Sequence, residues 1–308
     1  MKRWVACFVL VASALSSRVA VACPCSDDAG GALGLTSADE RFGAALVATS
    51  RRALGQHDAH GRYRALDDDE AESSEELLLR LGLRASPELE WLLELGGAAY
   101  RMHAGRHAER AVGFGDAIAR GRYVLRRESM PHASVPLPSV AVSALVRAPL
   151  GTIAEQRSAG FGSGGAQLGL GTWEVGLGVD AARGLLPELG VYVAAEAAYR
   201  FADHVLQRER QLGPRGELTL GLRAFPQAAL SGSVALRARV TGDVSLEGRS
   251  LSGTGERLLT LVVGAAHVDV GSGVRSALTL SLDPPVASFL GRSSTAAIAL
   301  GCSLGYAF

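Results

Sequence analysis

Arginine and acidic residues recur at every second position along many segments of this chain, which places them on one face of an extended strand. Eleven arginines and six carboxylates share that phase, a net of +5 in a chain whose formal net charge is +0. The set comprises Arg80, Arg84, Glu90, Glu94, Arg120, Arg122, Arg126, Arg147, Glu174, Asp180, Glu196, Arg200, Glu217, Arg223, Arg237, Arg239 and Arg275. An arginine-rich wall around a narrow aqueous path would favour small anions. Alternatively, these arginines and carboxylates pair with one another across strands and fill the interior.

The chain contains serine and histidine residues that could act in covalent catalysis, but they do not form a known catalytic motif. Ser143, Ser163, His204 and His267 stand outside any G-x-S-x-G elbow or metalloprotease helix motif. The glycine-rich segment 160–165 lacks the flanking strand and helix of a nucleotide-binding loop. We therefore predict no catalytic residues and no cofactor, so that the chain is not an enzyme.

Four histidines and one cysteine pair raise the question of a metal site. His57-x-x-His60 and His103-x-x-x-His107 fall in two predicted external loops, and Cys23-x-Cys25 opens the mature chain. Such short motifs supply too few ligands for a defined site, and solvated loop residues explain the histidines better. We predict that the chain holds no metal.

The elements that must position the charged face are strands, and the last one is the most distinct. Residues 295–308 alternate large apolar and small residues with a period of two, and the chain ends on Leu304-x-Tyr306-x-Phe308. This ending resembles the terminal assembly signal of bacterial outer-membrane β-barrels, which implies the barrel-assembly machinery as a partner. Such barrels turn apolar residues to lipid and polar residues inward.

The first 22 residues read as a secretory signal peptide. Lys2 and Arg3 precede an apolar run that ends at an A-x-A site, Ala20-Val21-Ala22. Residues 23–39 are then an N-terminal periplasmic tail, and residues 40–308 form the barrel. Lipidation of Cys23 is an alternative, because Val21-Ala22-Cys23 fits a lipidation box in part. Equal numbers of basic and acidic residues, 31 each, exclude a global basic footprint for nucleic acid.

Twelve candidate strands lie between residue 40 and the end. Residues 75–101 can form a hairpin of two strands, although Ser86-Pro87 is also a good helix start. The tenth strand has a phase slip near Gly264 that predicts a β-bulge. Connections after odd strands, among them 102–111, 204–213 and 243–255, are long, and most of those after even strands are short. This asymmetry is typical of outer-membrane barrels, which have short periplasmic turns and long external loops.

From Gly113 onward the chain resembles a family of outer-membrane proteins of the meta-pathway phenol-degradation type, which are regarded as transporters. The resemblance rests on Gly113-Phe114-Gly115-Asp116, on 147–152, on 171–178 and on the last five residues. It implies an outer-membrane barrel that binds or passes small, including aromatic, compounds.

Together these patterns predict an all-β protein, a transmembrane antiparallel up-and-down β-barrel of about 12 strands in the bacterial outer membrane. Its expected function is a channel or passive transporter for small aromatic or anionic solutes, with outer-membrane lipid around it. A closed structural or surface-interaction barrel is the alternative, and a soluble secreted β-sandwich is a third possibility. The residues leave open the solute, the state of the lumen and the oligomeric state.

Overall fold

The computed structural model describes residues 41–57, 62–67, 69–104, 107–127, 137–151, 171–186, 188–205, 208–227, 229–269, 271–284 and 295–307. The predicted signal peptide and periplasmic tail lie outside these ranges. Among the described residues there is no helix with the length and apolar character needed to cross a bilayer.

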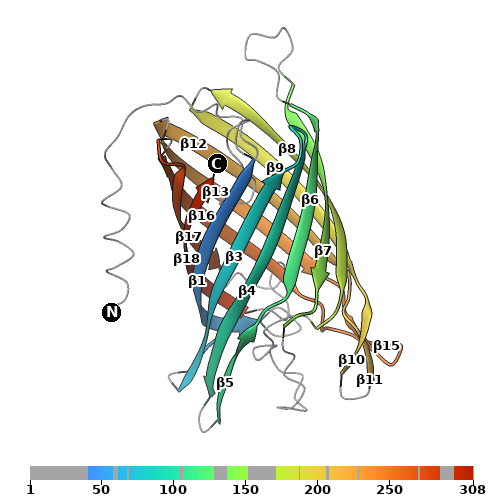
Figure 1. Cartoon of the computed structure of the whole chain (residues 1–308). Helices are drawn as coiled ribbons and strands as arrows, with labels where there is room; N and C mark the ends of the chain where they lie inside the picture. The colour runs from blue at the N-terminus through green and yellow to red at the C-terminus, as the bar shows by residue number, and fades with distance from the viewer. Residues whose placement is uncertain are drawn as a thin grey trace.

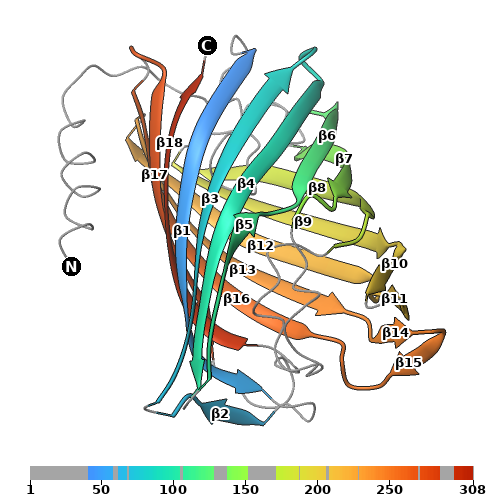
Figure 2. The same ribbon diagram turned by 60° about the horizontal axis from the view of Figure 1, so that its bottom comes forward.

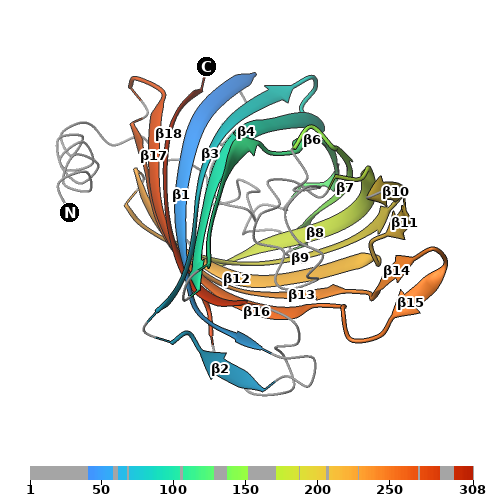
Figure 3. The same cartoon turned by 90° about the horizontal axis from the view of Figure 1, so that it is seen from below.

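Twelve antiparallel strands close into a barrel, because the last strand pairs with the first over almost its whole length (Figures 1 and 3). Each strand pairs with its neighbours in the chain, which is the predicted up-and-down order. The strands are β1 (Phe42–His57), β3 (Glu70–Arg84), β4 (Leu89–Ala104), β5 (His107–Phe114) continued by β6 (Ala117–Arg126), β7 (Ser139–Ala148), β8 (Glu174–Leu186), β9 (Leu189–Arg200), β12 (Arg215–Gln227), β13 (Leu230–Thr241), β16 (Arg257–Asp269), β17 (Val274–Asp283) and β18 (Thr295–Ala307).

The large apolar side chains lie on the outside of the barrel. Leu77, Leu177, Leu220 and Leu304 are 50%, 71%, 50% and 58% exposed, and many more leucines and valines share this face. A soluble β-sandwich would bury the same face between two sheets, so the closed barrel excludes that alternative. So much exposed apolar surface needs a lipid environment rather than water.

Exposed aromatic residues mark two levels on this outer face. Trp91 and Tyr306 lie near the end where the chain enters and leaves the barrel, and Trp173 and Tyr199 lie at the opposite ends of their strands. Two such belts at the borders of an apolar band are typical of membrane barrels, where aromatic rings sit at both interfaces. Figure 1 shows the end that carries the C-terminus at the top.

Residues 75–101 form two strands, as predicted, and not a helix. β3 and β4 pair without interruption from Glu70↔Ala104 to Arg84↔Glu90. The hydroxyl of Ser86 accepts hydrogen bonds from the backbone N–H groups of Glu88 and Leu89, so the capping signal organises a tight turn. The helix start in the sequence is therefore the turn of the hairpin.

The predicted bulge near Gly264 is wrong. β16 pairs in continuous register through Gly264 with both of its neighbours. The apparent phase slip arises because Val262 and Ala266 are apolar although they face inward, which blurs the alternation. A one-residue bulge instead joins β5 to β6, since β4 pairs Gly97 with Phe114 but Glu94 with Ile118.

Several predicted loops are built partly of strand. β4 and β5 extend through most of 102–111, because polar residues beyond the membrane can continue a ladder in water. The predicted loops 204–213 and 243–255 supply β10 (Ala202–Val205), β11 (Arg208–Gln211), β14 (Val244–Leu246) and β15 (Arg249–Leu251). These strands form a separate four-stranded sheet at the end of the barrel opposite Phe42 and Ala307 (Figure 2). The short β2 (Tyr63–Ala65) pairs with the end of β1 at the same end of the barrel.

We expect Gly96→Ala to lower the free energy of unfolding by about 1–3 kcal/mol. A Cβ at this position would come within 2.4 Å of the carbonyl oxygen of Leu77, a backbone atom that the hairpin ladder holds in place. Gly216→Ala is the matched control, because a Cβ there meets nothing within 4 Å. Urea titration of the folded protein in detergent micelles measures both changes, and equal losses would contradict the steric explanation.

Candidate functional site

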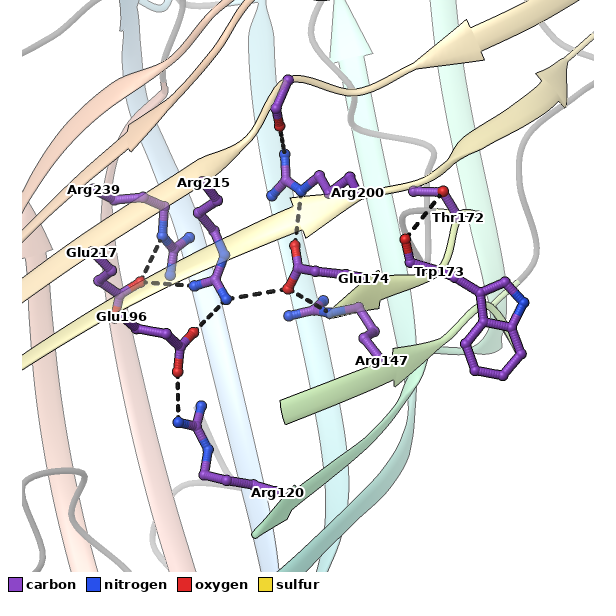
Figure 4. Close-up of polar contacts among 11 residues, drawn as sticks. Arg120, Arg147, Thr172, Trp173, Glu174, Glu196, Arg200, Arg215, Glu217 and Arg239 are labelled. Carbon is purple, nitrogen blue, oxygen red and sulfur yellow. Dashed lines mark hydrogen bonds and ion pairs between the residues drawn. The ribbon is translucent and has the colours of Figure 1, made fainter. Parts of the chain in front are cut away.

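A fully buried carboxylate, Glu174, lies at the centre of an interior cluster of charges. It is 0% exposed and forms ion pairs with Arg147 at 3.5 Å, Arg200 at 2.8 Å and Arg215 at 3.1 Å. Figure 4 shows the guanidinium groups surrounding it, whereas the neighbouring Trp173 points away from the cluster. One buried glutamate thus holds three arginines.

Two further glutamates extend the cluster along the wall. Glu196 pairs with Arg215 and with Arg120, both at 2.5 Å. Glu217 pairs with Arg215 at 3.3 Å, Arg237 at 3.3 Å and Arg239 at 2.9 Å. We call these nine residues the interior arginine cluster; they are Arg120, Arg147, Glu174, Glu196, Arg200, Arg215, Glu217, Arg237 and Arg239.

Strand register explains why the cluster forms where it does. Arg147, Glu174 and Arg200 are directly opposite one another on β7, β8 and β9. Glu196 and Glu217 are directly opposite on β9 and β12, where two like charges repel each other. Arg215 offsets that repulsion because its guanidinium contacts both carboxylates, as well as Glu174.

The most exposed side chains of the cluster are three of its arginines. The side chains of Arg120, Arg237 and Arg239 are 34%, 35% and 36% exposed. The carboxylates are less exposed than these three, with 0% for Glu174, 14% for Glu196 and 18% for Glu217. The remaining arginines, Arg147, Arg200 and Arg215, are 25%, 11% and 9% exposed. Six arginines against three glutamates leave a net of +3. The surface offered to a solute is therefore basic.

A second interior group lies nearer the end of the barrel where β1 begins and β18 ends. Arg122 binds Asp180 through two hydrogen bonds of 3.1 and 2.6 Å, and it lies 3.7 Å from Glu90. Arg84 donates to the same glutamate at 2.5 Å. A separate pair joins Arg80 and Glu94 at 2.6 Å across the first hairpin.

Three further predicted wall residues, like Arg80, lie outside both groups. The register places Arg223 on β12 and Arg275 on β17, both on the inward phase. Arg126 follows a register shift that places it opposite Val140, on the outward phase of Val142, and it donates to the carbonyl oxygen of Pro138 at 3.0 Å. The structure thus gathers most of the predicted wall arginines into the two groups and leaves Arg80, Arg126, Arg223 and Arg275 outside them.

The predicted site omitted Arg215, the residue that contacts all three glutamates of the cluster. It precedes Glu217 by two positions, so the period-two pattern would have found it had the eighth strand been started two residues earlier. Arg51 and Asp283 were also missed; they pair at 3.2 Å, and Thr260 donates to Asp283 at 2.6 Å. Arg51 and Asp283 lie far apart in the sequence, so no local pattern reveals that they pair.

Some residues of the predicted assembly signal and loop motifs lie outside the described part of the structure. Leu304 and Tyr306 lie on the outward face of β18, whereas Phe308 lies outside the described residues. His60 and the glycine-rich segment 160–165 also lie outside them. Within the described ranges, no group of three or more His, Cys, Asp or Glu side chains could hold a metal ion.

Comparison with solved structures supports the barrel assignment. The crystal structure of an outer membrane channel from Pseudomonas putida F1 matches with a TM-score of 0.70 at 14% identity, covering 92% of this chain and 100% of that one. The β domain of a Bordetella autotransporter, BrkA, matches with a TM-score of 0.50 at 12% identity, covering 87% of this chain and 100% of its own. The chain has the fold of an outer-membrane β-barrel.

No protein-family model matches the chain, and no curated protein sequence does. At identities this low, the structural likeness speaks to the fold alone. The resemblance to the meta-pathway phenol-degradation type therefore remains a hypothesis about function.

Proposed function

We propose that this chain is a passive outer-membrane channel that favours small anionic solutes. The observation that carries the proposal is the excess of six arginines over three glutamates in the interior arginine cluster, whose most exposed side chains are Arg120, Arg237 and Arg239. A basic surface in a low-dielectric tube raises the local concentration of anions and opposes the entry of cations. Transport, not catalysis, is the role that these charges suit.

The solute class follows from two separate arguments. Guanidinium groups bind carboxylates and phosphates, which favours small organic anions. The resemblance to the phenol-degradation type adds aromatic compounds. An aromatic carboxylate satisfies both arguments, and we propose this class as the first to test.

We further propose that the protein resides in the bacterial outer membrane, surrounded by lipid. The barrel-assembly machinery would recognise the terminal strand through Leu304, Tyr306 and Phe308. The exposed apolar face and the aromatic belts support this placement, since both require a bilayer.

The alternative is a closed structural or surface-interaction barrel. Ion pairs that skip strands favour it, because Arg120 on β6 reaches Glu196 on β9 and Arg122 reaches Asp180 on β8. Such links draw the wall inward and take up interior space. A filled interior and a basic channel wall therefore make opposite predictions for conductance.

Planar-bilayer recording of the detergent-refolded mature protein tests the proposal. We expect discrete conductance steps and, in a salt gradient, a reversal potential of the sign that indicates anion preference. Heat-modifiable gel mobility of the same sample confirms that a closed barrel has formed. A folded barrel without conductance would favour the structural alternative, and cation preference would refute the anion channel.

A further inference from the structure

A tyrosine on β9 lies across the inner wall of the barrel. Its neighbour Val193 is 38% exposed on the outer face, so Tyr192 has the inward phase. The register places Tyr192 opposite Gly221 on β12. A Cβ at Gly221 would come within 2.3 Å of the ring carbon Cζ and within 2.5 Å of the hydroxyl oxygen. The outer end of the ring therefore rests on the backbone of Gly221, where a larger residue would displace it.

Part of this ring is open to the interior. The other inward residues of the same row are small, with Ala182 on β8 and Ala235 on β13 to either side of Tyr192 and Gly221. An alanine side chain is too short to cover an aromatic ring, and Tyr192 is accordingly only half-buried. An aromatic surface that is open on a wall can stack a second aromatic ring.

Two arginines flank the tyrosine, one in each adjacent inward row. Arg237 on β13 lies opposite Thr219, on the side of the interior arginine cluster, and Arg223 on β12 lies on the other side of Gly221. Both guanidinium groups are near enough to interact electrostatically with the Tyr192 hydroxyl. An aromatic surface therefore adjoins a cationic group that belongs to the cluster.

Arg237 retains hydrogen-bond donors for a ligand. Its side chain is 35% exposed, and within the part of the chain that the structure describes it contacts one carboxylate, Glu217, through Nε at 3.3 Å. Neither terminal nitrogen of its guanidinium group has a described partner. Glu217 also pairs with Arg215 and Arg239, so it keeps two partners when Arg237 turns to a solute. Two parallel N–H donors suit the two oxygens of a carboxylate.

We propose that Tyr192 and Arg237 form a subsite for an aromatic carboxylate, with Gly221 providing the space for the tyrosine ring. The solute ring stacks on Tyr192, and its carboxylate accepts hydrogen bonds from the terminal nitrogens of Arg237. Neighbouring strands are ~4.8 Å apart, so the ring end above β12 lies one strand from β13 and Arg237, a distance that a benzoate spans. This inference rests on the proposed function and assigns its solute class to named residues.

A saturation-transfer NMR titration of the full mature chain, refolded in detergent, tests the subsite. The probes are benzoate and cyclohexanecarboxylate, which share their charge and differ in the aromatic ring. We expect the wild-type protein to bind benzoate about fivefold more tightly, the effect of stacking on one aromatic side chain. The titration reports binding whether or not the barrel conducts, so failure of the subsite and failure of the channel are distinguishable.

Variants separate stacking from charge. Tyr192→Leu should abolish the preference for benzoate, whereas Tyr192→Phe should keep it because stacking needs the ring alone. Gly221→Ala should reduce the preference as Tyr192→Leu does, because the added Cβ displaces the ring. Arg237→Gln should weaken the binding of both probes about tenfold and leave the ratio of their affinities unchanged.

Gly216→Ala is the matched control, because Gly216 lies on the same strand and a Cβ there meets nothing within 4 Å. It should leave both affinities unchanged, and heat-modifiable gel mobility shows that each variant forms a closed barrel. Equal affinity of the wild-type protein for the two probes, or an undiminished benzoate preference in Tyr192→Leu, would overturn the proposal. If Tyr192→Leu does not fold, the comparison of Gly221→Ala with Gly216→Ala decides, and an equal benzoate preference in these two variants counts against the subsite.

Discussion

Replacing Glu174 by glutamine is expected to lower the free energy of unfolding of the barrel by about 3–5 kcal/mol. The side chain is 0% exposed and holds Arg147, Arg200 and Arg215. Glutamine keeps the shape and removes the charge, so three buried guanidinium groups lose a common partner. The two carboxylates that remain, Glu196 and Glu217, cannot neutralise the six arginines of the cluster.

The same substitution at an exposed ion pair provides the control. Glu70 pairs with Arg64 at 2.9 Å, and the Arg64 side chain is 54% exposed. A pair in water contributes roughly 0–1 kcal/mol, so Glu70→Gln should leave the unfolding midpoint nearly unchanged. Urea titration followed by heat-modifiable gel mobility measures both variants. If Glu174→Gln proves no worse than Glu70→Gln, the interior arginine cluster does not stabilise the barrel.

The strands could be predicted because each has one apolar face on the outside of the barrel. Alternation of large apolar and other residues is strongest where one side must be apolar, as at Leu218, Leu220 and Leu222. The alternation no longer identifies a strand where neither face has to be apolar. Over 102–111 the strands β4 and β5 continue with polar residues, and these residues were taken for a loop. The false prediction of a bulge at Gly264 has another cause. Val262 and Ala266 are apolar although they face the interior, so the alternation in the sequence is interrupted while the strand register is not.

The charged face was predictable as a phase, but its partners were not. A period of two says that Arg120 and Glu196 point inward, and nothing in it says that they meet across two intervening strands. That contact depends on the curvature of the closed wall, which brings β6 and β9 together. Glu174 is likewise buried because arginines from three other strands cover it, which the sequence of its own strand does not show. Pairing and exposure within the cluster are thus properties of the closed barrel.

Reversing two charges of the interior arginine cluster should reverse the ion preference of the channel. Arg237 and Arg239 are 35% and 36% exposed and share a single carboxylate, Glu217. Arg237→Glu/Arg239→Glu changes the charge of this surface by four, from a net of +3 to −1. Because charged walls alter local ion concentrations by at least ~10-fold, the ratio of anion to cation permeability should fall by about that factor. The reversal potential in a salt gradient measures the change.

The double variant Arg183→Glu/Arg257→Glu carries the same change in total charge on the outer face of the barrel. Both arginines are exposed, and the register turns them away from the interior. Its reversal potential should match that of the wild-type protein, since lipid and the strand wall separate these groups from the solute path. An equal shift in both double variants would mean that total charge, and not the interior arginine cluster, sets the selectivity. An unchanged reversal potential in the interior variant alone would place the solute path away from Arg237 and Arg239.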